Sequence, residues 1–326
     1  MNYTPQLKNN FIIEINKKLK KGEKIWSSSG KLYEVPLLYA LTEAFNKCSY
    51  SVATATHGRK NIVSHVLTYK CSGSGTTILN CEIADILLIC IGKTNIRYSF
   101  IQTKADKNAS FTKIFLSVHQ WDMLHYLTKI NPYNTNIDPH VFSCALTESA
   151  ATYGNFYFDN NSNTIEMSYF IATLSNPINS LVTKNFIKGS IRKFDIKAIY
   201  NHTQNKRGFD EVQAVKSLDD LETYANSMKI GTPVFPIFSK TINTKEKATI
   251  SKENIASVNL IAQVKNLLMQ MDNDKANEMV KKINDLLIGA DYHFKDKNES
   301  SLICKNVVVI DCNQVDRKNY TQKKID

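Results

Sequence analysis

Three polar residues, Asp85, Gln102 and Lys104, lie in a pair of predicted strands that are otherwise apolar. Residues 83–91 are rich in Ile and Leu on both faces and are short, which indicates a central strand covered on both sides. A short turn follows, and residues 97–103 are predicted to form the second strand of a hairpin. A symmetric register places Asp85 opposite Gln102, and Lys104 shares the face of Gln102 because alternate side chains point the same way. The three groups are therefore expected together at one end of the hairpin.

This group of side chains suits metal-assisted hydrolysis of a phosphodiester. A hard cation such as Mg²⁺ takes oxygen ligands, which Asp85 and the side-chain oxygen of Gln102 can provide. The ion would polarise the phosphoryl oxygen and activate a water, while Lys104 would orient that water or stabilise the charge developing on phosphorus. A second interpretation is a surface salt bridge between Asp85 and Lys104 at a strand end. The pattern alone leaves both interpretations open.

Asp85 followed by Gln102-Thr103-Lys104 at the end of the next strand resembles the PD-(D/E)xK nuclease signature in its Q-x-K variant, as found among type II restriction endonucleases. The resemblance covers roughly residues 30–130. It implies a restriction-endonuclease-like fold of the α/β class, with a mixed β-sheet core flanked by helices, and Mg²⁺-dependent cleavage that leaves a 5′-phosphate and a 3′-hydroxyl. The sequence departs from the motif in two ways: alanine precedes Asp85 where the motif has proline, and Gln102 replaces an acidic residue.

The replacement by Gln102 removes one negative charge from the implied metal site, so a further carboxylate is expected to compensate. Glu34 is the first candidate, as a catalytic and metal-binding residue, because it begins a helix predicted to pack beside the hairpin. Glu43 and Glu82 are the alternatives. A carboxylate at the start of a helix is equally well explained by stabilisation of the helix N-terminus.

The charge of the chain favours a polyanionic partner. Lys and Arg number 41 against 30 Asp and Glu, a net charge of +11. Four basic residues in two loop-like clusters are candidates for contacts with DNA phosphates or base edges, although each cluster alone also fits a solvated surface: Arg59, Lys60, Lys206 and Arg207. Double-stranded DNA is the expected partner. A homodimer is also expected, because a two-fold dimer most easily cuts both strands of a symmetric site.

The organisation of the 326-residue chain is that of a globular protein, with 43% hydrophobic residues. We expect a nuclease core at 1–146, a DNA-recognition region continuing that core at 147–250, and a C-terminal helical extension, a helical pair with a final strand, at 251–326. No apolar run approaches the roughly 18 residues of a membrane-spanning helix, and residues 1–21 lack the apolar stretch of a signal peptide. We therefore expect no membrane partner and a cytoplasmic location.

Periodicity and turn chemistry predict the remaining elements. Seven cysteines without a C-x-x-C pair argue against a zinc or disulfide framework, and Cys90 and Cys144, inside apolar runs, are expected to act as small core residues. The other predicted elements are helices at 5–21, from residue 31, around 119–124, at 252–271 and at 273–287, strands at 50–56, 62–69, 141–146 and 307–310, and a hairpin across 156–174.

The expected function is a Mg²⁺-dependent endonuclease that cuts double-stranded DNA, of the type II restriction class, with a cognate DNA methyltransferase as its functional partner. Two alternatives stay open. One is a non-catalytic DNA-binding protein, in which Gln102 marks a lost metal site. The other is a repair or junction nuclease that selects DNA structure over sequence and uses the same residues.

Overall fold

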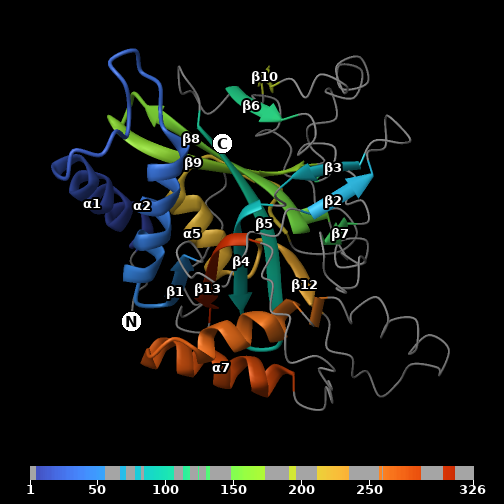
Figure 1. Ribbon diagram of the computed structural model, residues 1–326. Coiled ribbons are helices and arrows are strands. Elements are labelled where there is room, and N and C mark those ends of the chain that lie inside the picture. The colour runs from blue at the N-terminus through green and yellow to red at the C-terminus, as the bar shows by residue number, and fades with distance from the viewer. Residues whose placement is uncertain are drawn as a thin grey trace, which may run out of the picture.

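The computed structural model of the protein describes residues 5–55, 67–70, 78–81, 84–105, 113–117, 124, 130–132, 148–172, 191–195, 211–234, 257–258, 260–287 and 304–312. These residues form a mixed eight-stranded β-sheet with helices on both faces, which confirms the predicted α/β class (Figure 1). Among them, no helix is both long and apolar enough to cross a bilayer.

The main sheet contains both parallel and antiparallel pairs. β13 runs parallel to β4 and β5 runs parallel to β8, while the other neighbours are antiparallel. Its strands, in spatial order, are β1 (Ser51–Ala55), β13 (Cys304–Asp311), β4 (Ala84–Ile91), β5 (Ile96–Ala105), β8 (Ala151–Asp159), β9 (Thr164–Ile171) and β11 (Ala214–Val215), and β12 (Thr232–Val234) pairs with β5.

Two smaller sheets lie beside the main one. β6 (Lys113–Ser117) pairs with β10 (Ile191–Asp195), and β2 (Leu67–Lys70) lies between β3 (Ile78–Cys81) and β7 (Ile130–Pro132). β2 overlaps the last residues of the strand predicted at 62–69. Strand 141–146 and most of the helix around 119–124 lie outside the described residues.

The hairpin of β4 and β5 has the register expected from the sequence. Ile86 lies opposite Ile101 at one end and Ile91 opposite Ile96 at the other, and the turn closes with a 2.9 Å hydrogen bond from the Gly92 N–H to a backbone carbonyl. All eight residues of β4 are buried, as expected for a strand covered on both faces.

The last strand of the chain is a central strand of the sheet. β13 lies between β1 and β4, so the sheet takes strands from each of the three predicted segments. The predicted boundaries at 146 and 250 themselves fall outside the described residues. The late strand predicted at 307–310 is confirmed and longer than expected.

One face of the sheet is covered by α1 (Leu7–Lys20), α2 (Glu34–Lys47) and α5 (Leu218–Asn226). From α1, Leu7, Phe11 and Ile15 enter this core and form the apolar stripe of the helix, which confirms the helix predicted at 5–21. Helix α2 begins at Glu34, a little after the predicted start, because residues 25–33 form a small hairpin instead.

The opposite face is covered by a helix at 260–269 and by α7 (Asp274–Leu286). Ile261, Val264 and Leu268 are buried against the sheet, so the apolar side of the first helix is part of the core. In Figure 1 this pair lies below the sheet, away from α1 and α2. The burial of these side chains against the sheet shows that the C-terminal helices cover it directly.

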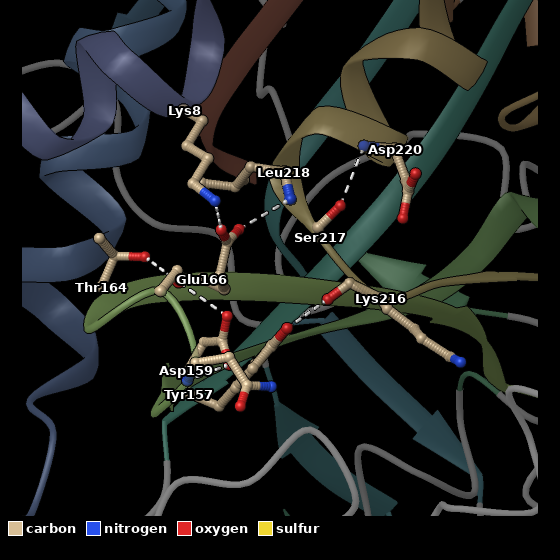
Figure 2. Close-up of polar contacts among 11 residues, drawn as sticks. Lys8, Tyr157, Asp159, Thr164, Glu166, Lys216, Ser217, Leu218 and Asp220 are labelled. Carbon is tan, nitrogen blue, oxygen red and sulfur yellow. Dashed lines mark hydrogen bonds and ion pairs between the residues drawn. The ribbon is translucent and has the colours of Figure 1, made fainter.

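Helix α5 is attached to the sheet by a buried carboxylate. Glu166, 2% exposed, accepts a 3.1 Å hydrogen bond from the Leu218 N–H at the start of α5 and forms an ion pair with Lys8 (Figure 2). Ser217 caps the same helix by accepting a 3.2 Å hydrogen bond from the Asp220 N–H. One glutamate thus joins β9, α5 and α1.

The β8–β9 hairpin confirms the hairpin predicted at 156–174. Its loop is held by Asp159, whose carboxylate accepts hydrogen bonds from the Asn161 N–H at 3.1 Å and the Ser162 hydroxyl at 2.7 Å. The Tyr157 hydroxyl donates to the Lys216 carbonyl at 2.6 Å, which fastens the hairpin to the segment before α5 (Figure 2).

The N-terminus of α1 is also held by a carboxylate. Glu222, fully buried on α5, accepts hydrogen bonds from the backbone N–H groups of Gln6 and Leu7, the latter at 2.9 Å, and from the Tyr50 hydroxyl. Negative charge is favourable at this end of a helix, where N–H groups lack partners within the helix.

Candidate active site

Asp85 and Gln102 are in direct contact at the end of the β4–β5 hairpin. The amide nitrogen of Gln102 donates a hydrogen bond to Oδ2 of Asp85, and both side chains are buried, with 3% and 2% exposed. This is the pairing predicted from the symmetric register.

The same carboxylate oxygen is bound by Thr103. Its backbone N–H and its hydroxyl donate to Oδ2 of Asp85 at 2.8 and 2.9 Å. The backbone ladder of the hairpin ends at Ile86 and Ile101, and the Asp85 carboxylate accepts the N–H group of Thr103, two residues beyond Ile101. These hydrogen bonds offset the cost of burying a charge in the sheet.

Asn306 supports Asp85 from the other side. Its side-chain nitrogen donates to the backbone carbonyl of Asp85 at 3.0 Å, across the parallel pair of β13 and β4. Sequence reasoning missed both Asn306 and Thr103. Thr103 lies inside the Q-x-K motif and could have been included, whereas nothing in the sequence indicates which late strand lies beside β4.

Lys104 lies at the end of β5 and meets Glu34 at the start of α2. Its Nζ is 3.8 Å from Oε1 of Glu34, and the two side chains are 15% and 32% exposed. The Lys104 ammonium is therefore near the surface, while Asp85 and Gln102 are buried. Among the described residues, the ion pair of Lys104 is formed with Glu34, and no salt bridge between Asp85 and Lys104 is seen there.

The groups at Asp85 are of the type that Mg²⁺ prefers as ligands, because a carboxylate and a side-chain amide both carry oxygen atoms. In the described conformation the Gln102 nitrogen faces the carboxylate, so the amide must turn to present its oxygen to an ion. Within the described part of the chain, no three Asp, Glu, His or Cys side chains gather as a metal site. Asp85 with Gln102 is thus a partial ligand set that a phosphate oxygen or water would have to complete.

The other candidate residues are placed as follows. Glu43 is exposed on α2, about 13 Å along the helix from Glu34 at 1.5 Å per residue. Cys90 is buried in the core, as predicted, and Cys144 lies outside the described residues. Five further candidates also lie outside them: Arg59, Lys60, Glu82, Lys206 and Arg207.

Comparison of the chain with protein-family models, with curated proteins and with solved structures finds no match. The geometry of the site and the resemblance of its motif therefore carry the functional argument.

Proposed function

We propose that the protein is a Mg²⁺-dependent endonuclease that hydrolyses double-stranded DNA, with a restriction-endonuclease-like core. The observation that carries this proposal is the contact between Asp85 and Gln102, with Lys104 two residues further along the same strand. The order and strand positions of these residues resemble the Q-x-K form of the nuclease signature. The mixed sheet with helices on both faces is compatible with that fold.

In this proposal Asp85 and Gln102 hold the ion, which when bound supplies Lewis-acid polarisation of the scissile phosphate and a more acidic water. Lys104 places a positive charge close to the phosphate, where it stabilises the negative charge that develops during the reaction. The Thr103 hydrogen bonds keep the Asp85 carboxylate in one orientation while Gln102 turns.

Glu34 is proposed first as a positioning residue for Lys104. Its Oε1 lies 3.8 Å from the Lys104 Nζ, and both side chains are partly exposed, so the two groups form a loose ion pair. This pair keeps the ammonium at the edge of the site. Its role as a third metal ligand remains a prediction. A type II restriction enzyme would further act as a cytoplasmic homodimer beside a cognate DNA methyltransferase, and these assignments belong to the same proposal.

A specific observation favours a second candidate, a non-catalytic DNA-binding protein. Oδ2 of Asp85 already accepts three hydrogen bonds, and Gln102 presents its nitrogen to the carboxylate. These hydrogen bonds satisfy the buried carboxylate without an ion. The net charge of +11 suits either candidate.

The test is incubation of the purified protein with a long unmethylated duplex in Mg²⁺, with a parallel reaction in EDTA. A reproducible ladder that requires Mg²⁺ supports a restriction endonuclease. Cleavage confined to branched or damaged DNA supports the repair or junction nuclease. DNA binding with no cleavage of any substrate overturns the nuclease and leaves the second candidate.

A further inference from the structure

The segment 17–33, which comprises the last turn of α1 and the link to α2, carries much of the positive charge of the molecule. It contains six lysines against one glutamate, a net charge of +5 in a chain whose total is +11. Within it, Lys20, Lys21, Lys24 and Lys31 are exposed. A concentration of charge in so short a surface segment favours contact with a polyanion.

The second half of this segment is an ordered small hairpin. The Tyr33 N–H donates to the Ile25 carbonyl at 2.9 Å, the Ser27 N–H donates to the Lys31 carbonyl at 2.9 Å, and Trp26 forms an isolated β-bridge with Leu32. Ile25 and Leu32 are buried, with 0% and 3% exposed, and so attach the hairpin to the core.

Trp26 is left on the surface of this hairpin. It is 46% exposed although indole is a large, mainly apolar group, and its neighbours Ile25 and Leu32 supply the packing of the hairpin. Lys24 and Lys31 are exposed on the two arms of the same hairpin, and the Lys31 ammonium lies 5.5 Å from the ring centroid of Tyr33. An exposed aromatic ring on a hairpin that also carries exposed lysines suits contact with a nucleic acid, where sugars and bases alternate with phosphates.

The hairpin borders the candidate active site. It continues directly into α2, whose first residue Glu34 lies 3.8 Å from Lys104. In Figure 1 the blue segment between α1 and α2 lies above the start of α2, at the upper end of the sheet. DNA bound at Lys104 would therefore lie next to Trp26.

We infer that residues 17–33 form a DNA-contacting arm, in which Trp26 stacks on a base or sugar and Lys24 and Lys31 neutralise the flanking phosphates. This inference deepens the proposed function, since it names the surface by which the substrate is held. An anionic membrane is the less favoured ligand, because the arm offers one ring and a serine-rich tip in place of the broad apolar face that membrane binding uses.

The experiment exploits the two tryptophans of the chain. The Trp121→Phe variant retains Trp26 as its only tryptophan, and a short labelled duplex is titrated in EDTA while tryptophan emission and DNA anisotropy are both recorded. Bound DNA is expected to quench Trp26. In the otherwise unaltered chain, Trp26→Ala should weaken DNA binding roughly tenfold and Trp26→Phe should retain it within about threefold, since a phenyl ring still stacks.

The lysines are tested by the dependence of DNA affinity on salt. The double change Lys24→Gln with Lys31→Gln should reduce the slope of log affinity against log salt by about 2. Lys93→Gln, at the exposed turn of β4 and β5, is the matched control and should leave the slope unchanged. Thermal unfolding of each variant confirms that the fold is retained.

Any of three results would overturn the arm. The first is DNA binding that leaves the emission of Trp26 unchanged, and the second is a DNA affinity of the Trp26→Ala variant within twofold of that of the unaltered chain. The third is an emission change that occurs only with vesicles of phosphatidylcholine and phosphatidylserine. These outcomes are separate from those of the cleavage test. If DNA quenches Trp26 but is not cleaved in Mg²⁺, the arm is retained and the nuclease proposal is overturned. If DNA is cleaved but the emission of Trp26 does not change, only the arm is overturned.

Discussion

At the scale of single residues, two buried carboxylates have different surroundings. Glu222 is bound by the N-terminal N–H groups of α1 and by Tyr50, groups that the fold fixes in place. Asp85 is bound by Thr103 and by the Gln102 amide, a side chain that can turn. The first arrangement is made by groups of the fold itself, whereas the second includes one side chain, Gln102, that can turn away from the carboxylate.

Changing Glu222→Gln should lower the free energy of unfolding by roughly 2 kcal/mol or more, because the amide replaces one acceptor with a donor that faces the N–H groups of α1. Urea denaturation measures the change. The matched control is Glu23→Gln, which removes a surface pair with Lys18 and should cost less than about 0.5 kcal/mol. Equal losses in the two variants would contradict the capping role.

Glu14 gives the stability a dependence on pH. Burial raises the pKa of Glu14, but hydrogen bonds and ion pairs with Lys47 and Lys17 outweigh it and hold the pKa below its ordinary value. A lowered pKa stabilises the folded state above the unfolded pKa of about 4.3, and this stabilisation is lost as the pH falls through the folded pKa.

Unfolding free energies of the unaltered chain and of Glu14→Gln, compared at a series of pH values, test this effect. The variant should be less stable at pH 7, and the gap should be constant down to about pH 5 and narrow below about 4.3. A gap that stays constant to pH 3 would show that the carboxylate charge has no such role.

At the scale of elements, short β12 pairs with β5 through a close approach of two backbones. Gly231 has φ of +82°, and a Cβ there would lie 2.6 Å from the carbonyl oxygen of Tyr98. Gly22, after α1, has nearly the same φ of +79° but nothing within 4 Å of an added Cβ. The two glycines share a backbone conformation and differ in crowding.

Gly22→Ala should therefore cost about 1–2 kcal/mol, the penalty for a left-handed L-residue. Gly231→Ala should cost clearly more, because β12 must also move away from Tyr98. Chemical denaturation of both variants measures the difference. Equal losses would mean that the contact between β12 and β5 relaxes without cost.

At the scale of the whole molecule, local pairings were predictable and distant ones were not. The contact of Asp85 with Gln102 joins residues within one hairpin, whose register follows from its apolar pattern and its turn. The bond of Asn306 to Asp85 spans most of the chain, and the helix cap by Glu222 likewise joins distant segments. A single sequence carries no signal for such pairings.

The same limit explains the architecture. Strand 307–310 was predictable from its valines, but its place between β1 and β4 depends on parallel pairing with a strand far back in the chain. Glu34 was selected because it begins a helix near the hairpin, and the structure brings it to Lys104. The catalytic roles of Asp85, Gln102 and Lys104 stay predictions.

The most direct test compares DNA cleavage in Mg²⁺ by the unaltered chain, Asp85→Asn, Lys104→Met and the control Lys93→Met. Asn can still accept the Thr103 hydrogen bonds, and Met keeps the apolar stem of the lysine, so both active-site variants should fold and bind DNA. We predict that each loses about 100-fold or more in cleavage rate while Lys93→Met is unaffected. Near-normal cleavage by either active-site variant would contradict the proposed site.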